Sequence, residues 1–277
     1  MDHASFDLEA YLERIGHQGG LDPTLETLRA IHLAHATSVP FENLDIQLGR
    51  PISLEMDRLQ AKLVRDRRGG YCFEQNHLFM AALRAVGFGV TPLAARVRLG
   101  TTSPTPRTHM LLRVELEAES WIADVGFGAD GLLQPIPLLE DAVDGQFGWE
   151  YRLIREPGSV WVLQSRRPDG WFDLYGFTEE PTPFVDYVMG NHFTSTHPQS
   201  PFVRNVIAQV ATVETRLILL NRELREARPD GERLLATLDD DEMLTVLDER
   251  FGLAFAHGTR FRALVDPPAQ EGPTVTA

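Results

Sequence analysis

Arg68-Gly69-Gly70-Tyr71-Cys72-Phe73-Glu74-Gln75-Asn76 holds the only cysteine of the chain and places it at the start of a helix. The two glycines permit a sharp turn before the cysteine. Apolar residues from Phe79 to Val86 recur at helical spacing, which predicts a helix that ends near Gly87. The unpaired N–H groups and the dipole of a helix start favour a thiolate. The stretch therefore predicts a nucleophile, with the commoner alternative that Cys72 is a small buried hydrophobic side chain.

The composition is that of an ordinary globular protein, with 277 residues of which 43% are hydrophobic and 24% are charged. This length allows one large domain or two to three small ones. No apolar run approaches the ~18–20 residues needed to span a bilayer, and the N-terminal residues lack the features of a signal peptide. A single cysteine forms no internal disulfide and needs a reducing compartment to stay free. We therefore expect a cytoplasmic protein.

The net charge of −14 argues against binding to nucleic acids or to acidic membranes, because contact with phosphates needs a basic face. Lys62 is the only lysine, and its neighbours predict a surface helix, so Schiff-base chemistry is not expected. The chain has neither a P-loop motif nor a Gly-x-Ser-x-Gly motif.

Residues 1–88 are predicted to form a helical domain. Amphipathic patterns predict helices over residues 6–16 and from Asp22-Pro23 to Ser38, and a third helix that Ser53 caps. His32 and His35 lie three residues apart on the second helix, a spacing that two ligands of one metal ion could have. No third ligand is apparent nearby, so we expect ordinary structural histidines and no metal.

The hydrophobic period changes from helical to alternating at about residue 90. Residues 110–116 and 121–125 alternate on either side of a short turn and predict a hairpin, which a strand over 93–99 precedes. Further strands are predicted at 149–155, 159–165 and 171–177, with proline and glycine turns between them. Short strands at this spacing suggest an antiparallel sheet or a small barrel.

The last third of the chain is predicted to mix helices and strands. With the helical first part and the antiparallel strands after it, the predicted fold class is α+β. A short helix is expected to end at Gly190, and residues 191–198 are expected to be irregular. Strands are predicted around 203–213 and 215–224, followed by a helix that Asp239 caps. The tail from Pro267 onward is expected to be loose.

His109 and Asp124 are predicted at one end of the 110–125 hairpin. Directly opposed residues of antiparallel strands lie only about 5 Å apart, so the two side chains are expected to be close. The order of a helix cysteine, a strand histidine and a strand carboxylate is that of papain-like enzymes, in which the third residue orients the imidazole. Each residue alone is more often structural, but their combination with the glycine turn favours a Cys72–His109–Asp124 triad.

Residues 126–131 match the pattern Gly-x-Gly-x-x-Gly, which is typical of dinucleotide sites when it opens a helix. The residues that follow are broken by prolines and do not predict a helix, so a dinucleotide site is not expected. Gly126 and Gly128 still favour a loop whose backbone a ligand or a thioester approaches closely.

Several motifs together resemble one known family, the arylamine N-acetyltransferases. The likeness covers most of the chain, with the motifs in the right order. An N-terminal signature is resembled by Val39-Pro40-Phe41-Glu42-Asn43-Leu44, and the nucleophile motif by Arg68-Gly69-Gly70-Tyr71-Cys72-Phe73-Glu74. The histidine motif is resembled by Thr108-His109, and the aspartate motif by Asp124-Val125-Gly126-Phe127-Gly128. A later serine–proline signature is resembled by Ser195-Thr196-His197-Pro198 with Ser200-Pro201-Phe202.

The resemblance implies a papain-like core of three parts: a helical domain over 1–88, an antiparallel β-barrel domain over 89–190 and an α/β lid over 191–277. It implies acetyl transfer from acetyl-CoA, as co-substrate, to aromatic amines and hydrazines. Cys72 is then the nucleophile, His109 the base and Asp124 the residue that orients it. Four residues are implied as substrate contacts, with no metal: Phe127, Val97, Phe202 and Thr108. The resemblance does not place the CoA contacts, and our candidate for them is the loop with Gly126 and Gly128, because an acidic protein needs arginines or backbone N–H groups to accept the CoA phosphates.

These roles predict a ping-pong reaction through an acetyl-Cys72 thioester, with backbone N–H groups at the helix start stabilising the oxyanion. Three alternatives remain open. The same triad would serve a cysteine hydrolase or transglutaminase-like enzyme, and a relative within the family would be an amide synthase that closes a polyketide macrolactam. The third is a binding module with an inactive site.

Overall fold

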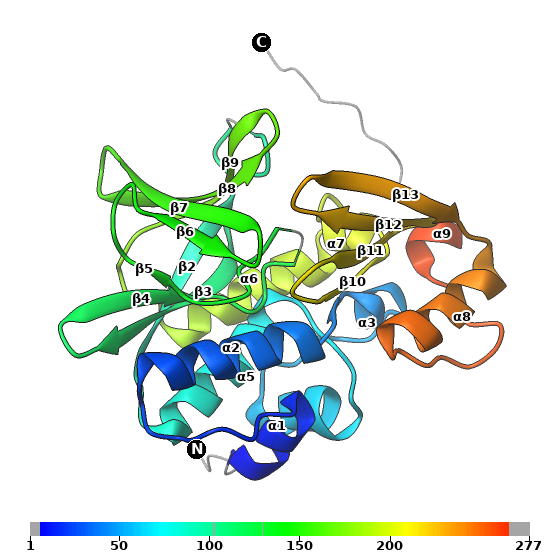
Figure 1. Ribbon diagram of the computed structural model, residues 1–277. Coiled ribbons are helices and arrows are strands. Elements are labelled where there is room, and N and C mark those ends of the chain that lie inside the picture. The colour runs from blue at the N-terminus through cyan, green and yellow to red at the C-terminus, as the bar shows by residue number, and fades with distance from the viewer. Residues whose placement is uncertain (1–5, 102, 129, 266–277) are drawn as a thin grey trace.

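The computed structural model describes residues 6–101, 103–128 and 130–265, which form helices packed against two antiparallel sheets (Figure 1). This agrees with the predicted α+β class. The predicted loose tail from Pro267 lies outside the described residues. Within the described ranges, every helix is too short or too polar to cross a membrane.

The helices of the first part pack around α5, the helix that begins at Cys72. Apolar side chains line one side of α5, and Gly87 ends it in the left-handed conformation (φ +110°), as predicted. The helices are α1 Leu8–Ile15, α2 Leu25–Ser38, α3 Leu44–Gln47, α4 Met56–Leu59, the π-helix η1 Gln60–Arg65 and α5 Cys72–Val86.

Two predicted helix starts in this part were wrong. Helix α2 begins at Leu25 rather than at Asp22-Pro23, because the Thr24 hydroxyl accepts a hydrogen bond from the Thr27 N–H (3.3 Å) and serves as N-cap. The helix expected after Ser53 begins only at Met56 and continues as a π-helix, so its register differs from a simple 3.6-residue repeat.

An eight-stranded antiparallel sheet follows, in the order β5-β4-β3-β2-β9-β8-β7-β6. The predicted strands are present, and the sheet curls so that its two edges approach each other (Figure 1). Gln146 on one edge strand joins them, since its side chain accepts from the N–H groups of Leu133 (3.0 Å) and Gln134 (2.9 Å). The strands are β2 Gly89–Val97, β3 Arg107–Leu116, β4 Glu119–Ala123, β5 Ile136–Pro137, β6 Val143–Gln146, β7 Trp149–Glu156, β8 Val160–Arg167 and β9 Gly170–Phe177.

Helix α6, Phe184–Thr196, crosses the molecule between the two sheets (Figure 1). The sequence predicted that this helix ends at Gly190, and that was wrong. A Cβ at Gly190 would lie 2.9 Å from the Phe73 ring, so this glycine allows close packing against α5 rather than a helix end. Residues 191–196, expected to be irregular, are therefore helical.

The second sheet has five strands in the order β1-β10-β11-β12-β13, with helices beside it. Strand β1 comes from the helical part and pairs with β10, with Phe41 opposite Gln209, so it ties the two parts together. The strand predicted over 203–213 begins only at Ile207, because the Ser200 hydroxyl accepts from Phe202 N–H (3.3 Å) and caps a short helix there. The elements are β1 Phe41–Glu42, β10 Ile207–Ala211, β11 Arg216–Leu220, β12 Glu223–Arg228, β13 Gly231–Thr237, α7 Pro201–Arg204, α8 Asp240–Phe251 and α9 Arg262–Val265.

Three clusters of buried apolar side chains correspond to this arrangement. One lies between the helices and the eight-stranded sheet, around Phe79 and Leu112. A second fills the inside of that sheet, around Leu111 and Tyr151. The third lies between the five-stranded sheet and α8, around Leu247. The start of α5 and the ends of β3 and β4 meet at the border of the first two clusters.

Candidate active site

Cys72 is the first residue of α5 and is buried, with 4% of its surface exposed. Neither preceding glycine has a positive φ, so they are not needed for the backbone angles of the turn. They are needed for close approach, because a Cβ at Gly69 would lie 2.1 Å from the Pro40 carbonyl oxygen and one at Gly70 2.7 Å from the Glu74 carboxylate. The glycine pair thus allows the cysteine turn to pack directly against β1.

The β3–β4 hairpin brings His109 and Asp124 together as predicted. His109 lies near the start of β3, and Asp124 follows Ala123, which is opposite Leu112 in the last pair of the ladder. The His109 Nε2 is 2.7 Å from Asp124 Oδ2, and both side chains are at most 2% exposed. The Cys72 Sγ lies 3.5 Å from the carbonyl oxygen of Thr108, the residue immediately before His109. The three predicted catalytic residues therefore meet at one place.

The ionisation of the pair follows from its contacts. Burial alone lowers the pKa of His109, but the Asp124 carboxylate and the Cys72 thiol outweigh it and raise that pKa to about 10. Burial raises the pKa of Asp124, but the His109 imidazolium and hydrogen bonds from Asn76 and Gly126 outweigh it, so the pKa lies below its usual range. His109 is an imidazolium bound to a carboxylate, with Nδ1 left to face the thiol.

Asp124 is held by more groups than the sequence indicated. The Asn76 amide donates to Asp124 Oδ1 (2.8 Å), and the Gly126 N–H donates to the same oxygen (3.0 Å). The Asn76 side chain also accepts from the Val125 N–H (3.1 Å). Asn76 lies one helical turn after Cys72, so the i, i+4 spacing on α5 was a signal that it shares the face of the cysteine.

The predicted glycines of the loop after β4 pack against the predicted catalytic residues and their neighbours. A Cβ at Gly126 would lie 2.8 Å from the Asn76 amide nitrogen and 2.9 Å from Cys72 Cα. Gly128 has φ +69°, and a Cβ there would lie 3.0 Å from the Phe41 ring. Both positions therefore exclude a side chain, and Gly128 also needs the left-handed conformation.

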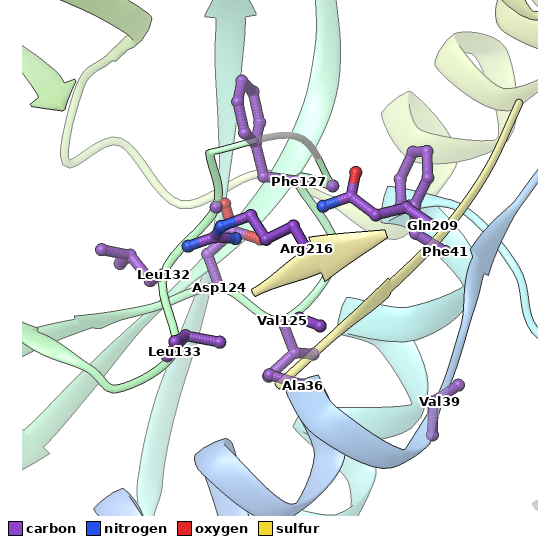
Figure 2. A pocket seen from close by; sticks show the side chains of 13 residues that line it. Ala36, Val39, Phe41, Asp124, Val125, Phe127, Leu132, Leu133, Gln209 and Arg216 are labelled. Atoms are coloured by element: carbon purple, nitrogen blue, oxygen red, sulfur yellow. The ribbon is translucent and has the colours of Figure 1, made fainter. Parts of the chain in front are cut away.

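Phe127 lies next to His109, with 5.1 Å between the ring centroids. Phe127 and Gly128 also line a cavity of about 30 Å³, shown in Figure 2, to which α2, the loop after β4 and strands β10 and β11 contribute. Asp124 and Arg216 line the same cavity, whereas Cys72 and His109 are not among its lining residues. The cavity thus borders the carboxylate side of the triad.

The other predicted substrate contacts lie at different distances from the triad. Phe202 packs on Tyr71, the neighbour of Cys72, with 5.4 Å between the ring centroids. Thr108 provides the carbonyl beside the thiol. Val97 lies at the end of β2, opposite Tyr175 of β9, with its carbonyl accepting from the Thr105 hydroxyl (2.7 Å). Of the four, Phe127 and Thr108 contact His109 or Cys72 directly, whereas Val97 and Phe202 have no described contact with Cys72, His109 or Asp124.

The described residues contain no group of three histidine, cysteine or acidic side chains arranged to hold a metal ion. His32 and His35, the pair considered for a metal, instead make hydrogen bonds with both ring nitrogens.

Comparison with known proteins identifies the family. Residues 24–259 match the family model described as N-acetyltransferase. The chain is 46% identical over 201 residues to the arylamine N-acetyltransferase of Escherichia coli (strain K12), covering 72% of this chain and 71% of that protein. The structure of the Nocardia farcinica arylamine N-acetyltransferase superimposes with a TM-score of 0.87 at 41% identity, covering 92% of each chain. The Mycobacterium marinum enzyme, whose structure is a complex with CoA, superimposes with a TM-score of 0.84 at 36% identity, covering 89% of this chain and 93% of that one. The chain belongs to the arylamine N-acetyltransferase family.

Proposed function

We propose that this enzyme transfers the acetyl group of acetyl-CoA to aromatic amines or hydrazines through an acetyl thioester on Cys72. The observation that carries the proposal is the buried His109–Asp124 pair, 2.7 Å apart, beside the thiol at the start of α5. The family of the chain supports acetyl-CoA as donor, and the CoA complex of the M. marinum relative agrees with it.

In the first half-reaction, the Cys72 sulfur attacks the carbonyl carbon of the acetyl thioester as a thiolate paired with the His109 imidazolium. The N–H groups at the start of α5 are the candidate donors to the oxyanion, because the helix dipole and the unpaired amides point to that side. The bond from the carbonyl carbon to the CoA sulfur then breaks. His109 gives its proton to the leaving sulfur, so CoA departs as a thiol.

In the second half-reaction, the nitrogen of an arylamine or hydrazine attacks the acetyl-Cys72 carbonyl. The bond to Cys72 breaks, and His109 receives the proton that the nitrogen loses, which restores the thiolate–imidazolium pair. Asp124 keeps the imidazole in the orientation that serves both steps. The donor and the acceptor use the same sulfur in turn, so the kinetics are ping-pong.

Water must be kept from the thioester, and aromatic side chains lie where they would exclude it. Phe127 packs on His109, and Phe202 packs on Tyr71 next to the nucleophile. The Gly126 N–H is already bonded to Asp124, so we assign the closest approach of the donor to the backbone at Phe127 and Gly128. Val97 and Thr108 complete the proposed set of substrate contacts.

We propose the division into a helical domain over 1–88, a barrel domain over 89–190 and a lid over 191–277. The described helices α1–α5, the eight-stranded sheet and the five-stranded sheet support the three parts. The boundary at residue 190 falls inside helix α6, Phe184–Thr196, so this helix connects the barrel domain to the lid. The free thiol of Cys72 supports a reducing compartment, and we propose the cytoplasm.

The decisive experiment is intact-protein mass spectrometry after incubation with acetyl-CoA and no amine. We expect one added acetyl group on the wild-type chain with release of one equivalent of CoA, and none on Cys72→Ser. Addition of an arylamine should remove the adduct and yield the acetylated amine. Absence of the adduct from a folded protein would overturn the proposal, and loss of the adduct to water alone would favour a hydrolase.

A further inference from the structure

Helix α2 carries two histidines that the proposed reaction does not use. His32 and His35 lie on one side of the helix, and both are fully buried. Both ring nitrogens of each are within hydrogen-bond distance of a protein group. A buried histidine with one acceptor and one donor as partners, and no carboxylate among them, is neutral and fixed in one tautomer, and it holds the two groups that it joins at a fixed distance.

The two partners of His32 define its tautomer. Its Nδ1 is 3.0 Å from the Leu133 carbonyl oxygen, which only accepts, so Nδ1 carries the hydrogen. Its Nε2 is 3.1 Å from the Asp124 N–H, which only donates, so Nε2 is the bare nitrogen. Burial lowers the pKa of His32 to about 4, which agrees with a neutral ring.

The His32 Nε2 gives the Asp124 N–H a hydrogen-bond acceptor that the β3–β4 ladder does not provide. The β3–β4 ladder ends at Ala123, opposite Leu112, so the N–H of Asp124 lies one residue beyond the last ladder pair. A buried N–H without a partner costs free energy, and the backbone would shift to find one. His32 reaches it from α2, ninety-two residues earlier in the chain.

The hydrogen bond from His32 Nδ1 to the Leu133 carbonyl is a second contact with the segment 124–133. Asp124 and Leu133 bound the loop that contains Phe127 and Gly128, so one imidazole joins both ends of that loop. The side chain of Asp124 is fixed separately, by Asn76 and by the Gly126 N–H. His32 fixes its backbone, and through it the direction from which the carboxylate meets His109.

We propose that His32 is a positioning residue for acetyl transfer: its neutral imidazole holds the backbone of Asp124 and the far end of the 124–133 loop, and thereby sets the geometry of the His109–Asp124 pair. This proposal rests on the roles assigned above to Cys72, His109 and Asp124. His32 touches neither substrate nor sulfur and acts only through Asp124.

His35 is the matched comparison on the same helix. It is as deeply buried, but its Nδ1 accepts from the Tyr11 hydroxyl (2.8 Å) and its Nε2 donates to the Gln75 side chain (3.2 Å). None of these partners is Cys72, His109 or Asp124. A change at His35 therefore removes a buried imidazole from α2 without removing a bond to the triad.

The test compares two substitutions that each keep one of the two bonds of His32. In His32→Asn the side-chain amide replaces the Nδ1–H and donates to Leu133, but the side chain is too short to reach Asp124. In His32→Gln the side-chain oxygen reaches the position of Nε2 and accepts from Asp124. We expect His32→Asn to lose about 10-fold in kcat with little change in KM, since small misplacement of a catalytic group has effects of this order. His32→Gln should recover most of that loss.

A second readout follows the triad without any acyl donor. The rate at which iodoacetamide alkylates Cys72 reports the thiolate–imidazolium pair, and its pH profile should shift in His32→Asn and return toward wild type in His32→Gln. His35→Asn should lower the melting temperature by about as much as His32→Asn does, and it should leave the pH profile of Cys72 alkylation unchanged. Alkylation needs no acetyl-CoA, so the two proposals can fail separately. If the wild-type chain forms no acetyl adduct but the alkylation profile of His32→Asn is shifted, acetyl transfer is contradicted and the positioning role of His32 stands.

Two results would overturn the inference. One is a folded His32→Asn variant with the wild-type alkylation profile, and the other is an equal shift of that profile in His35→Asn. Nitrogen-15 NMR of the wild-type histidines decides the case even if the variants do not fold. It should show His32 neutral, with the hydrogen on Nδ1, between about pH 5 and pH 8, where an exposed imidazole would titrate. A charged His32 or one with the hydrogen on Nε2 would contradict the inferred bonds.

Discussion

Two clusters of charged side chains have the same contact distances and opposite surroundings. The first, the buried cluster, lies behind the nucleophile turn and consists of Glu42, Asp45, Lys62, Arg68 and Glu74. The second, the outer-strand cluster, lies on β12 and β13 and consists of Glu223, Arg225, Glu226, Arg228, Glu232 and Arg233. Arg68 is 2.7 Å from Glu42, and Arg225 is 2.6 Å from Glu223. The Glu42 side chain is fully buried, whereas those of Arg225 and Glu223 are 35% and 44% exposed.

The difference teaches that distance alone does not give the contribution of an ion pair. Water and salt screen the outer-strand cluster, so breaking a pair there leaves each charge hydrated. In the buried cluster, a charge that loses its partner is left in a medium that hydrates it poorly. That cluster also holds the turn before Cys72, because Glu74 pairs with Lys62 (2.7 Å) and accepts from the Tyr71 N–H (3.1 Å).

The largest effect is expected from Arg68→Met. This change leaves Glu42 buried without the guanidinium that binds it through two nitrogens, at 3.1 Å and 2.7 Å. We expect the free energy of unfolding to fall by about 3–5 kcal/mol, the usual cost of breaking a buried pair from one side. Denaturant titration measures it, and a loss below about 1 kcal/mol would show that Glu42 is solvated and that the two clusters are alike.

A smaller effect, of opposite sign, is expected when Glu42→Gln is added to Arg68→Met. The second change removes the charge that the first left unpaired, while Asp45 keeps its pair with Lys62 (2.9 Å). We expect recovery of about 1–3 kcal/mol, the range of coupling between residues in contact. The full double-mutant cycle gives the coupling energy, and strict additivity would mean that Glu42 and Arg68 do not interact energetically.

The sequence predicted the elements that carry the chemistry better than the contacts that hold them. Helix α5 and the β3–β4 hairpin follow from local patterns, and the hairpin alone brings His109 to Asp124. Lys62 was predicted on a surface helix, but its side chain is 17% exposed and bound to Glu74 and Asp45. Its partners lie 12 and 17 residues away, on other elements, so no periodicity of the chain predicts the pairing.

Gly190 and His32 show the same limit for packing and for hydrogen bonds. A glycine inside a helix pattern resembles a helix end, and only the Phe73 ring against Gly190 shows why the helix continues. The helical pattern predicts that His32 lies on α2, but it does not predict the partner, Asp124, which follows ninety-two residues later. Most elements set by one segment were predictable, except helix starts that a local cap such as Thr24 decides, whereas contacts between distant segments were not.

The dependence of stability on pH extends the comparison to buried groups with and without a partner charge. Burial lowers the pKa of His32 to about 4 and that of His35 to about 3, whereas the Asp124 carboxylate outweighs burial and, with Cys72, raises the pKa of His109 to about 10. Burial also lowers the pKa of the half-buried His77 to about 4. As the pH falls from about 6.5 to 4, the unfolded chain therefore binds protons at His32, His35 and His77 that the folded chain does not. Stability is therefore lost by up to about 1.4 kcal/mol per pH unit for each of them.

Above about pH 6.5 the change of stability with pH has the opposite sign, because stability is lost as the pH rises. His109 stays protonated in the folded chain and not in the unfolded one, so its contribution is full below pH 6.5 and is lost as the pH rises to about 10. We expect maximum stability near pH 6–7, measured by denaturant titration across the pH range. His35→Asn should lower the slope of the acid limb between about pH 4 and pH 6.5 by roughly a third, because His32 and His77 still contribute to it. An unchanged slope would mean that His35 is not buried as a neutral ring.

The smallest effect is expected from Arg225→Ala in the outer-strand cluster. Arg225 pairs with Glu223 (2.6 Å) and Glu232 (2.9 Å), contacts as short as those of Arg68, but water solvates all three groups. We expect the melting temperature to change by about 2 °C or less, and the change to vanish in about 1 M NaCl, where the screening length is a few ångströms. The loss in Arg68→Met should persist in the same salt, because buried pairs are screened far less. If Arg225→Ala destabilised the chain as much as Arg68→Met, contact distance and not burial would set the strength of these ion pairs.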